Sequence, residues 1–424
     1  MGRVANLICG LLTAAIWCLP HTVSAQPLQV QTVISPNSAG VPILEERGLI
    51  RLNANSRVYE KRFLIRFPDN PGQWNERLII GVHGGSGGAL YSRTGSMIET
   101  SETALDDVVA DHATSLGYAY ASLDRQGIGG TREGLGLVHA FADQARLRIQ
   151  EIFGRRARHV YLVGFSAGGA IARFASEEPK PRYDGILIVA GAGGTMLQLE
   201  RQAKLASLWP DVDPVRNPHL DARDAKIVLY SKAVGTSGDA RKFWSFVGAG
   251  QSLGQLRRTL ESLGLTGLSD KDVLGFRIKN HDDNEAFMSN IRQLRSTDVT
   301  GKVTVPTIEV VGTYDDVVLV GVKDYKDKVQ DVSRKARFRK PIHNHRLYQV
   351  EGVWHISVDD DALQTFQFFM GQMGVSSEAQ NWLESGGTYI PTVEEALAYL
   401  DRWISERKSP PSDQTVRPSQ QLKK

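Results

Sequence analysis

The sequence predicts an α/β protein in which helices flank a mostly parallel central sheet, with a largely helical insertion. Between residues 60 and 195, short apolar runs alternate with segments whose apolar residues recur at helical spacing. The apolar runs are continuous, which is typical of parallel strands covered by helices on both faces. The rhythm stops near residue 195 and resumes near residue 301, so we expect an inserted helical cap between them.

Strands are predicted where an apolar run ends at Gly, Pro, Asn or Asp, which favour turns. The polar segment 26–60 has scattered Pro and Asn, and we expect one early strand within it. The other predicted strands are residues 62–67, 77–82, 118–123, 160–163, 185–190, 305–312 and 346–350.

Helices are predicted where apolar residues recur every three or four positions. The last helix has Thr392 as a plausible N-cap, with Glu395 three residues on. The charged stretch 323–340 is assigned no element. The predicted helices are residues 103–116, 136–153, a helix that starts at Ala167, and residues 361–373 and 392–406.

The N-terminus is typical of a signal peptide. Arg3 precedes an apolar run at residues 7–19, and Val23-Ser24-Ala25 fits the small-residue rule for cleavage after Ala25. No second apolar run is long enough to span a membrane, although an uncleaved anchor is the alternative. We therefore expect a secreted or periplasmic protein without stable membrane insertion.

Composition sets further limits. The chain has 424 residues with 50 Lys and Arg against 47 Asp and Glu, so nothing favours a nucleic-acid partner. Its two cysteines, Cys9 and Cys18, lie in the signal peptide, which leaves neither a disulfide nor a thiolate metal site. The expected organisation is signal peptide 1–25, first core part 26–195, cap 196–300, second core part 301–408 and disordered tail 409–424.

The residues around Ser166 are the most informative motif. A β-branched apolar run leads into Gly164-Phe165-Ser166-Ala167-Gly168, and a helix of small residues follows. A strand, a sharp turn and a helix in this order force the central serine into a strained backbone conformation, so its neighbours must be small. The motif predicts a serine hydroxyl raised above the end of a sheet, beside a helix N-terminus.

An activated serine needs a base, and the base needs a carboxylate that orients it. Asp315 follows one predicted core strand, and His355 follows the next. The carboxyl ends of parallel strands meet at one edge of a sheet, so Ser166 can meet these side chains there. Asp316 adjoins Asp315 and is the alternative acid.

The order Ser, Asp, His resembles that of the α/β-hydrolase superfamily. The resemblance covers residues 60–195 and 300–405 and implies the α/β-hydrolase fold, with its cap at the insertion. The matching motifs are His83-Gly84-Gly85, Gly164-Phe165-Ser166-Ala167-Gly168, Gly312-Thr313-Tyr314-Asp315 and Gly352-Val353-Trp354-His355.

The resemblance also implies an oxyanion hole made of backbone amides. Its candidate donors are the N–H groups of Ala167 and Gly85, with Gly84 as a further candidate. Because Ser86 stands where a third consecutive glycine would be, the choice between these amides stays open.

Other polar clusters have simpler interpretations. His343 and His345 could ligate a metal, but no matched carboxylates accompany them, and we expect a solvated loop. Residues 281–284 are expected to form a helix-capping turn. Asp124 and Arg125 follow a strand near the predicted site and could contact substrate or hold a loop.

Together these features predict an exported serine hydrolase that cleaves carboxylic esters through Ser166, His355 and Asp315. We expect neither a cofactor nor a metal, and the substrate is a small or oligomeric ester. The alternatives are a peptidase or amidase of the same fold, or an inactive binding scaffold. The sequence leaves aromatic, lipid-like and polyester-derived substrates open.

Overall fold

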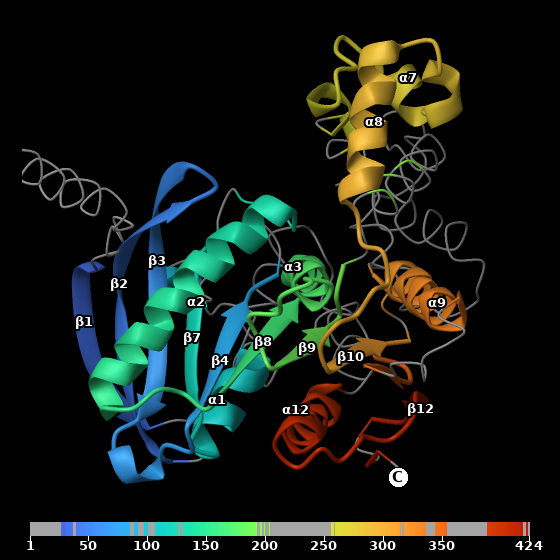
Figure 1. Ribbon diagram of the computed structural model, residues 1–424. Coiled ribbons are helices and arrows are strands. Elements are labelled where there is room, and N and C mark those ends of the chain that lie inside the picture. The colour runs from blue at the N-terminus through green and yellow to red at the C-terminus, as the bar shows by residue number, and fades with distance from the viewer. Residues whose placement is uncertain are drawn as a thin grey trace, which may run out of the picture.

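The structure is a computed structural model built around one large sheet (Figure 1). It describes residues 27–36, 40–84, 89–91, 97–100, 107–125, 128, 130–192, 196, 199, 203, 256–257, 259–313, 315, 318–335, 344–353, 388–418 and 421–422. The predicted signal peptide therefore lies outside the described residues.

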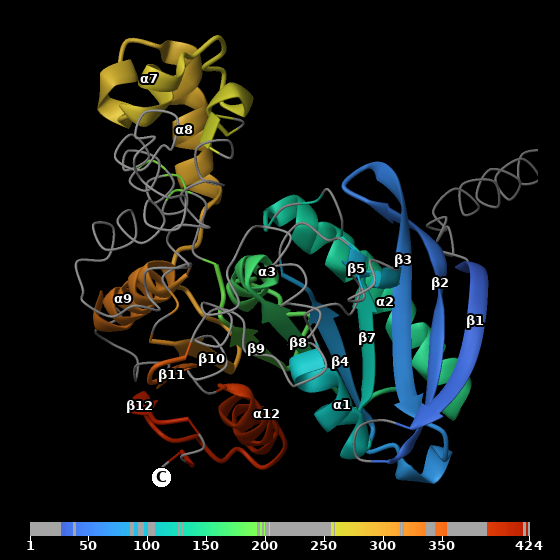
Figure 2. The same ribbon diagram turned by 180° about the vertical axis from the view of Figure 1, so that it is seen from behind.

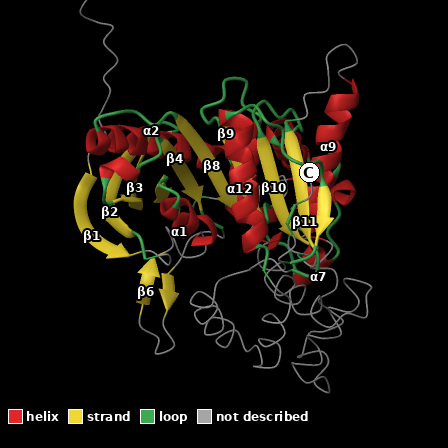
Figure 3. Cartoon of the chain, turned by 90° about the horizontal axis from the view of Figure 1, so that it is seen from below, coloured by secondary structure: helices red, strands yellow, loops and turns green. Residues whose placement is uncertain are grey.

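The sheet has ten strands in the order β1-β2-β3-β7-β4-β8-β9-β10-β11-β12. Strands β1 to β3 and the β3–β7 pair are antiparallel, whereas all pairs from β7 to β12 are parallel. The hairpin β5–β6 lies outside this sheet (Figure 3). The strands are β1 (Pro27–Pro36), β2 (Pro42–Ala54), β3 (Arg57–Pro68), β4 (Arg77–Val82), β5 (Ala89–Tyr91), β6 (Met97–Thr100), β7 (Ala119–Leu123), β8 (His159–Phe165), β9 (Gly185–Val189), β10 (Thr307–Gly312), β11 (His345–Val350) and β12 (Gln414–Val416).

Helices cover both faces of the sheet, as predicted. Helices α2 and α3 cross one face (Figure 1), and α1 and α12 pack on the other (Figure 2). Strands β4 and β8 are buried almost throughout because they lie between these layers. The helices are α1 (Asp107–Ser115), α2 (Arg132–Phe153), α3 (Ala167–Ser176), α7 (Asp270–Leu274), α8 (Glu285–Thr297), α9 (Leu319–Lys335) and α12 (Ile390–Ser405), with short 3-10 helices η1 (Pro71–Gln73) and η3 (Ile278–His281).

The described part of the predicted insertion has a hydrophobic cluster of its own. Leu256, Leu260, Phe287 and Ile291 are completely buried in it, and Met196 joins from the chain that follows β9. Figure 1 places α7 and α8 beyond α9 and away from the sheet. That this unit caps the site stays a prediction, and the aromatic residues expected to line a pocket lie outside the described residues.

The N-terminal half of the sheet differs from the prediction. Residues 26–60 contain two long strands, β1 and β2, and the start of a third, β3. A turn at Asn55 and Ser56 joins β2 to β3. Along β2, polar residues alternate with buried residues. The segment therefore lacks the continuous apolar run by which the other strands were predicted.

One helix was not predicted, and one predicted helix cap was wrong. The charged stretch 323–340 begins within α9, whose Val322 and Tyr325 are completely buried. Thr392 is buried inside α12 and does not cap it, because this helix begins at Ile390 after Tyr389. By contrast, Asn284 does cap α8, as expected for residues 281–284, since its side chain accepts from the Phe287 N–H at 3.0 Å.

The predicted disorder from residue 409 was also wrong for the described residues. Strand β12 pairs with β11 in parallel, and Val416 is buried. Leu422 is 4% exposed, and its N–H donates to Glu395 Oε2 at 2.9 Å. Because β12 is the last strand in the sheet order, this segment closes the edge of the sheet beside β11.

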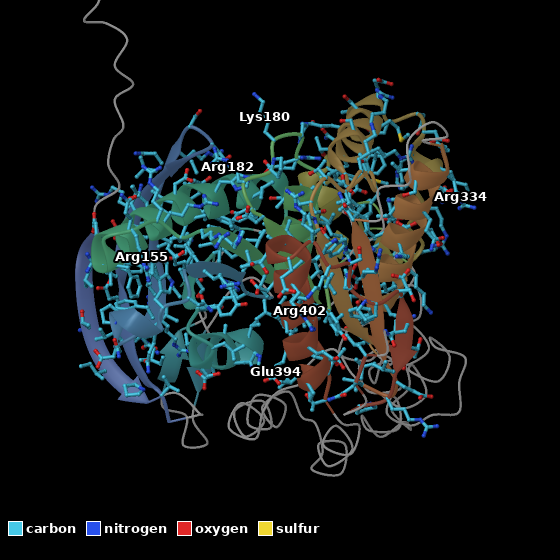
Figure 4. The ribbon with its side chains drawn as sticks, turned by 60° about the horizontal axis from the view of Figure 1, so that its bottom comes forward. Arg155, Lys180, Arg182, Arg334, Glu394 and Arg402 are labelled. Carbon is cyan, nitrogen blue, oxygen red and sulfur yellow. The ribbon has the colours of Figure 1, made fainter. Side chains whose placement is uncertain are left out.

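Charged side chains are distributed over the outside of the molecule. The labelled residues in Figure 4 come from the loop after α2, the α3–β9 loop, α9 and α12, and do not gather in one patch: Arg155, Lys180, Arg182, Arg334, Glu394 and Arg402. Among the helices that the structure describes, none combines the length and apolarity needed to cross a bilayer.

Candidate active site

Ser166 occupies a sharp turn between β8 and α3, as predicted. Its φ of 50° and ψ of −117° are sparsely populated for a residue with a side chain. Three backbone hydrogen bonds hold this turn. The Ser166 N–H donates to Val189 O at 3.0 Å, and its carbonyl accepts from Gly169 at 2.9 Å and Ala192 at 2.7 Å. Bonds to both the N–H and the carbonyl of Ser166 therefore hold this residue in its strained conformation.

The glycines that flank Ser166 are required by close backbone approaches. A Cβ on Gly164 would lie 2.5 Å from Gly168 O, and a Cβ on Gly168 would lie 2.0 Å from Val82 O. Neither distance is compatible with a carbon atom at that position. The two glycines thus let β8, α3 and the end of β4 meet at the serine.

Asp315 lies just beyond β10, at the same edge of the sheet as Ser166. Strands β8, β9 and β10 are parallel neighbours, so the two residues follow strands separated only by β9. Asp315 is 1% exposed, and its Oδ1 accepts from the Val318 N–H at 3.2 Å. Its carbonyl accepts from Leu319, the first residue of α9, at 2.8 Å.

Two predicted oxyanion residues also lie next to the serine. Ala167 is the first residue of α3, where N–H groups have no partner within the helix. Gly84 follows β4, and a Cβ there would lie 2.9 Å from Ser166 Cβ. The ends of β4 and β8 therefore bring Gly84, Ser166 and Ala167 together.

Three predicted site residues fall outside the described residues: His355, Asp316 and Gly85. After β11 ends at Val350, the described residues continue only to Val353 and resume at residue 388. β11 is parallel to β10, so residues after it emerge at the edge where Asp315 lies. The roles of these three residues stay predictions.

A buried ionic cluster behind the serine was missed from the sequence. Arg173 of α3 and Glu309 of β10 are both fully buried, and Arg173 Nη2 donates to Glu309 Oε1. Arg173 also donates to the carbonyls of Gly191 and Ala192. Because the Ala192 N–H donates to Ser166 O, this cluster supports the serine turn indirectly. An acidic residue inside an otherwise apolar strand was the available signal.

His345 belongs to this cluster, and its predicted place in a solvated loop was wrong. It is the first residue of β11, is 3% exposed, and has its Nε2 3.4 Å from Glu309 Oε2. Burial lowers the pKa of His345 below its usual value, against the opposing effect of Glu309. His343, its partner in the possible metal pair, lies outside the described residues.

Known proteins resemble this chain in sequence and in structure. No family model matches it. Over 173 residues it is 27% identical to a mono(2-hydroxyethyl) terephthalate hydrolase from Piscinibacter sakaiensis. That alignment covers 38% of this chain and only 27% of the relative, so the chain matches less than two thirds of that protein's length.

The structural neighbours cover most of the chain. Feruloyl esterase B from Aspergillus oryzae matches with a TM-score of 0.50 at 12% identity, covering 92% of this chain and 88% of that one. Tannin acyl hydrolase from Aspergillus niger matches with the same TM-score and identity, covering 92% and 86%. Together with the sheet order and the strained serine, these matches show that the chain has the α/β-hydrolase fold.

Proposed function

We propose that this protein is a serine hydrolase of carboxylic esters. One observation carries the proposal: Ser166 has a strained, positive φ at the carboxyl end of a parallel strand, with the first turn of α3 behind it. Such strain is costly and persists at sites where the protein needs a side chain in an otherwise unfavourable position. At this position the serine hydroxyl stands at the sheet edge to which Asp315 also contributes.

In the proposed reaction His355 takes the proton of the Ser166 hydroxyl while the serine oxygen attacks the ester carbonyl. Backbone amides of Ala167 and of Gly85 or Gly84 stabilise the oxyanion. His355 then returns the proton to the leaving alcohol, and an acyl-enzyme remains. A water molecule activated by His355 hydrolyses the acyl-enzyme. Asp315 stabilises the charged imidazole, with Asp316 as the alternative acid.

For the substrate we propose esters of aromatic acids. The names of the matched hydrolase, feruloyl esterase and tannin acyl hydrolase all refer to aromatic acyl groups. The predicted cap over residues 196–300 would supply the apolar cover that such a group needs. We further propose that residues 1–25 direct export and are removed after Ala25, which intact mass measurement of the secreted protein would test.

The test is labelling of the protein with a fluorophosphonate probe. We expect labelling of the wild type and of Ser405→Ala, a surface serine of α12, and loss of labelling in Ser166→Ala and His355→Ala. Ester turnover should fall by at least about 10³-fold in both of the latter. Folded wild type that is not labelled would overturn the proposal, and the binding scaffold would then replace it.

Two further comparisons refine the assignment. The acid is identified by Asp315→Asn and Asp316→Asn, of which only the true partner should lower kcat by about 10⁴-fold. The substrate class is tested with 4-nitrophenyl benzoate, acetate and decanoate and with a peptide anilide. Highest kcat/KM on the benzoate supports aromatic esters, and highest kcat/KM on the anilide would establish a peptidase or amidase.

A further inference from the structure

Two buried polar side chains, one just after β4 and one just after β7, have no part in the proposed chemistry. His83 is 2% exposed and Arg125, which follows β7, is 1% exposed. Buried polar groups of this size are retained only when their hydrogen bonds are made. The contacts of these two residues therefore show what they hold in place.

The hydrogen bonds of His83 define its protonation. Its Nε2 accepts from the backbone N–H of Arg125 at 3.0 Å, so this nitrogen carries no proton. The proton is then on Nδ1, which donates to Gly84 O at 2.7 Å. The carboxylate of Asp124 lies 3.7 Å from Nε2, beyond hydrogen-bond distance. His83 thus links two backbone segments and is not placed to act as a base.

Arg125 makes a second set of bonds between the same loops. Its Nε and Nη2 both donate to the His83 carbonyl, at 3.1 and 2.8 Å. Its Nη1 donates to Ile128 O at 2.6 Å. The planar guanidinium thereby fixes the chain after β4 to the chain after β7, a geometry that an ammonium group cannot reproduce. Of the two roles left open for Arg125, these bonds favour holding a loop.

Both loops touch the serine turn. A Cβ on Gly84 would lie 2.9 Å from Ser166 Cβ, and a Cβ on Gly168 would lie 2.8 Å from His83 O. On the other side, a Cβ on Gly130 would lie 2.7 Å from Ala167 O. The pair His83–Arg125 therefore fixes two backbone segments that are packed directly against Ser166 and Ala167.

We propose that Arg125 is a positioning residue for the oxyanion hole and acts through His83 and Gly84. This inference rests on the proposed function. The carbonyls of His83 and Gly84 are both held, and a peptide group is planar. The bonds of Arg125 to the His83 carbonyl consequently also fix the N–H of Gly84, because that carbonyl and that N–H belong to the same peptide group. An amide fixed in advance stabilises an oxyanion without reorganisation when the charge develops.

The test compares Arg125→Lys with Arg77→Lys. Arg77 lies at the opposite end of β4 and has the same kind of fork geometry, since its Nε and Nη2 donate to the two carboxylate oxygens of Asp401. We expect Arg125→Lys to lower kcat on 4-nitrophenyl benzoate by about 10-fold or more, less than the 10²- to 10³-fold lost when a donor is removed. KM should change less than about 2-fold, and Arg77→Lys should keep the wild-type kcat.

His83 provides a second, independent test. In His83→Asn an amide nitrogen replaces Nδ1 and can still donate to Gly84 O, whereas His83→Gln places its amide at the position of Nε2. We expect the Asn variant to retain at least about 5-fold more kcat than the Gln variant, because only the Asn side chain keeps the bond to Gly84 O, which helps to hold the backbone of Gly84. The rate of fluorophosphonate labelling should follow the same order.

The outcomes separate this inference from the proposed function. An unlabelled, inactive wild type would defeat the proposed function itself. An active wild type with equal kcat losses in Arg125→Lys and Arg77→Lys would overturn the positioning role, as would a change confined to KM. A Gln variant of His83 that matches or exceeds the Asn variant would overturn the route through Gly84.

Discussion

The backbone conformation of Ser166 lowers the stability of the folded state. Its positive φ is typically about 1–3 kcal/mol less favourable than an ordinary backbone conformation for a residue with a Cβ. The hydrogen bonds to Val189, Gly169 and Ala192 hold it there. The strain therefore belongs to the native state and should be measurable by substitution.

We expect Ser166→Gly to be more stable than Ser166→Ala by about 1 kcal/mol. Glycine adopts this conformation without strain, and the gain exceeds its extra entropy in the unfolded chain. Urea unfolding of the two inactive variants at 25 °C measures the difference. Equal stability, or a more stable alanine variant, would mean that the turn is not strained.

The burial of His345 predicts that the free energy of unfolding depends on pH. Its pKa in the folded state is lowered from 6.5 by burial, so the unfolded state takes up the proton first as the pH falls. Its contribution to stability is therefore complete above about pH 6.5 and is lost below that value. Glu309, Lys326 and Asp413 are the charged groups that face it and influence its pKa.

The variant His345→Gln tests this dependence. Between pH 7.5 and pH 5.5 the wild type should lose about 1 kcal/mol more free energy of unfolding than the variant. Urea titrations at the two pH values give both slopes. Identical slopes in the two proteins would show that His345 does not remain neutral in the fold.

At the scale of elements, the C-terminal segment is the clearest case in which contacts override composition. Its residues are those of a disordered tail, yet Asp413 Oδ1 accepts from Leu347 N–H at 2.9 Å, and its other oxygen lies 2.5 Å from Lys326 Nζ. The Tyr348 hydroxyl donates to Pro411 O at 3.0 Å. The edge of β11 supplies the backbone partners that make β12 possible.

Leu422→Ala should lower the free energy of unfolding by about 2 kcal/mol, because the side chain is 4% exposed. The neighbouring exposed Gln421→Ala should change it by less than about 0.5 kcal/mol. Thermal or urea unfolding distinguishes them. A disordered tail would give two variants indistinguishable from the wild type.

At the scale of the whole molecule, the sheet and the unit formed by residues 256–294 have separate hydrophobic clusters. Two clusters lie on the faces of the sheet, and the third contains Leu256, Phe287 and Ile291. Units with separate cores can open independently. The second unit can thus vary in stability without disturbing the serine turn.

Phe287→Ala should accelerate amide hydrogen exchange across residues 259–294, corresponding to about 3 kcal/mol of lost local stability. Exchange in β8 and β10 should remain as in the wild type. Mass spectrometry of peptides from the two regions makes the comparison. Equal acceleration in both would show that they unfold as one unit.

The fold and the serine turn were predictable because their causes are local. Continuous apolar runs identify parallel strands, and Gly164 and Gly168 flank a serine that only a sharp turn can present. The position of Asp315 beyond β10 followed from the same logic, since parallel strands end at one edge. These conclusions require only the order of residues along the chain.

What the tertiary structure decided depends on contacts between distant segments. The burial of His345 beside Glu309 and Arg173, the docking of β12 on β11, and the bonds of Arg125 to His83 each join residues from different elements. A buried charge or a polar tail cannot be assigned from local pattern, because its partner determines whether burial is tolerated. By itself the sequence determined where the serine turn would form, and only the packing of other segments decided what holds it there.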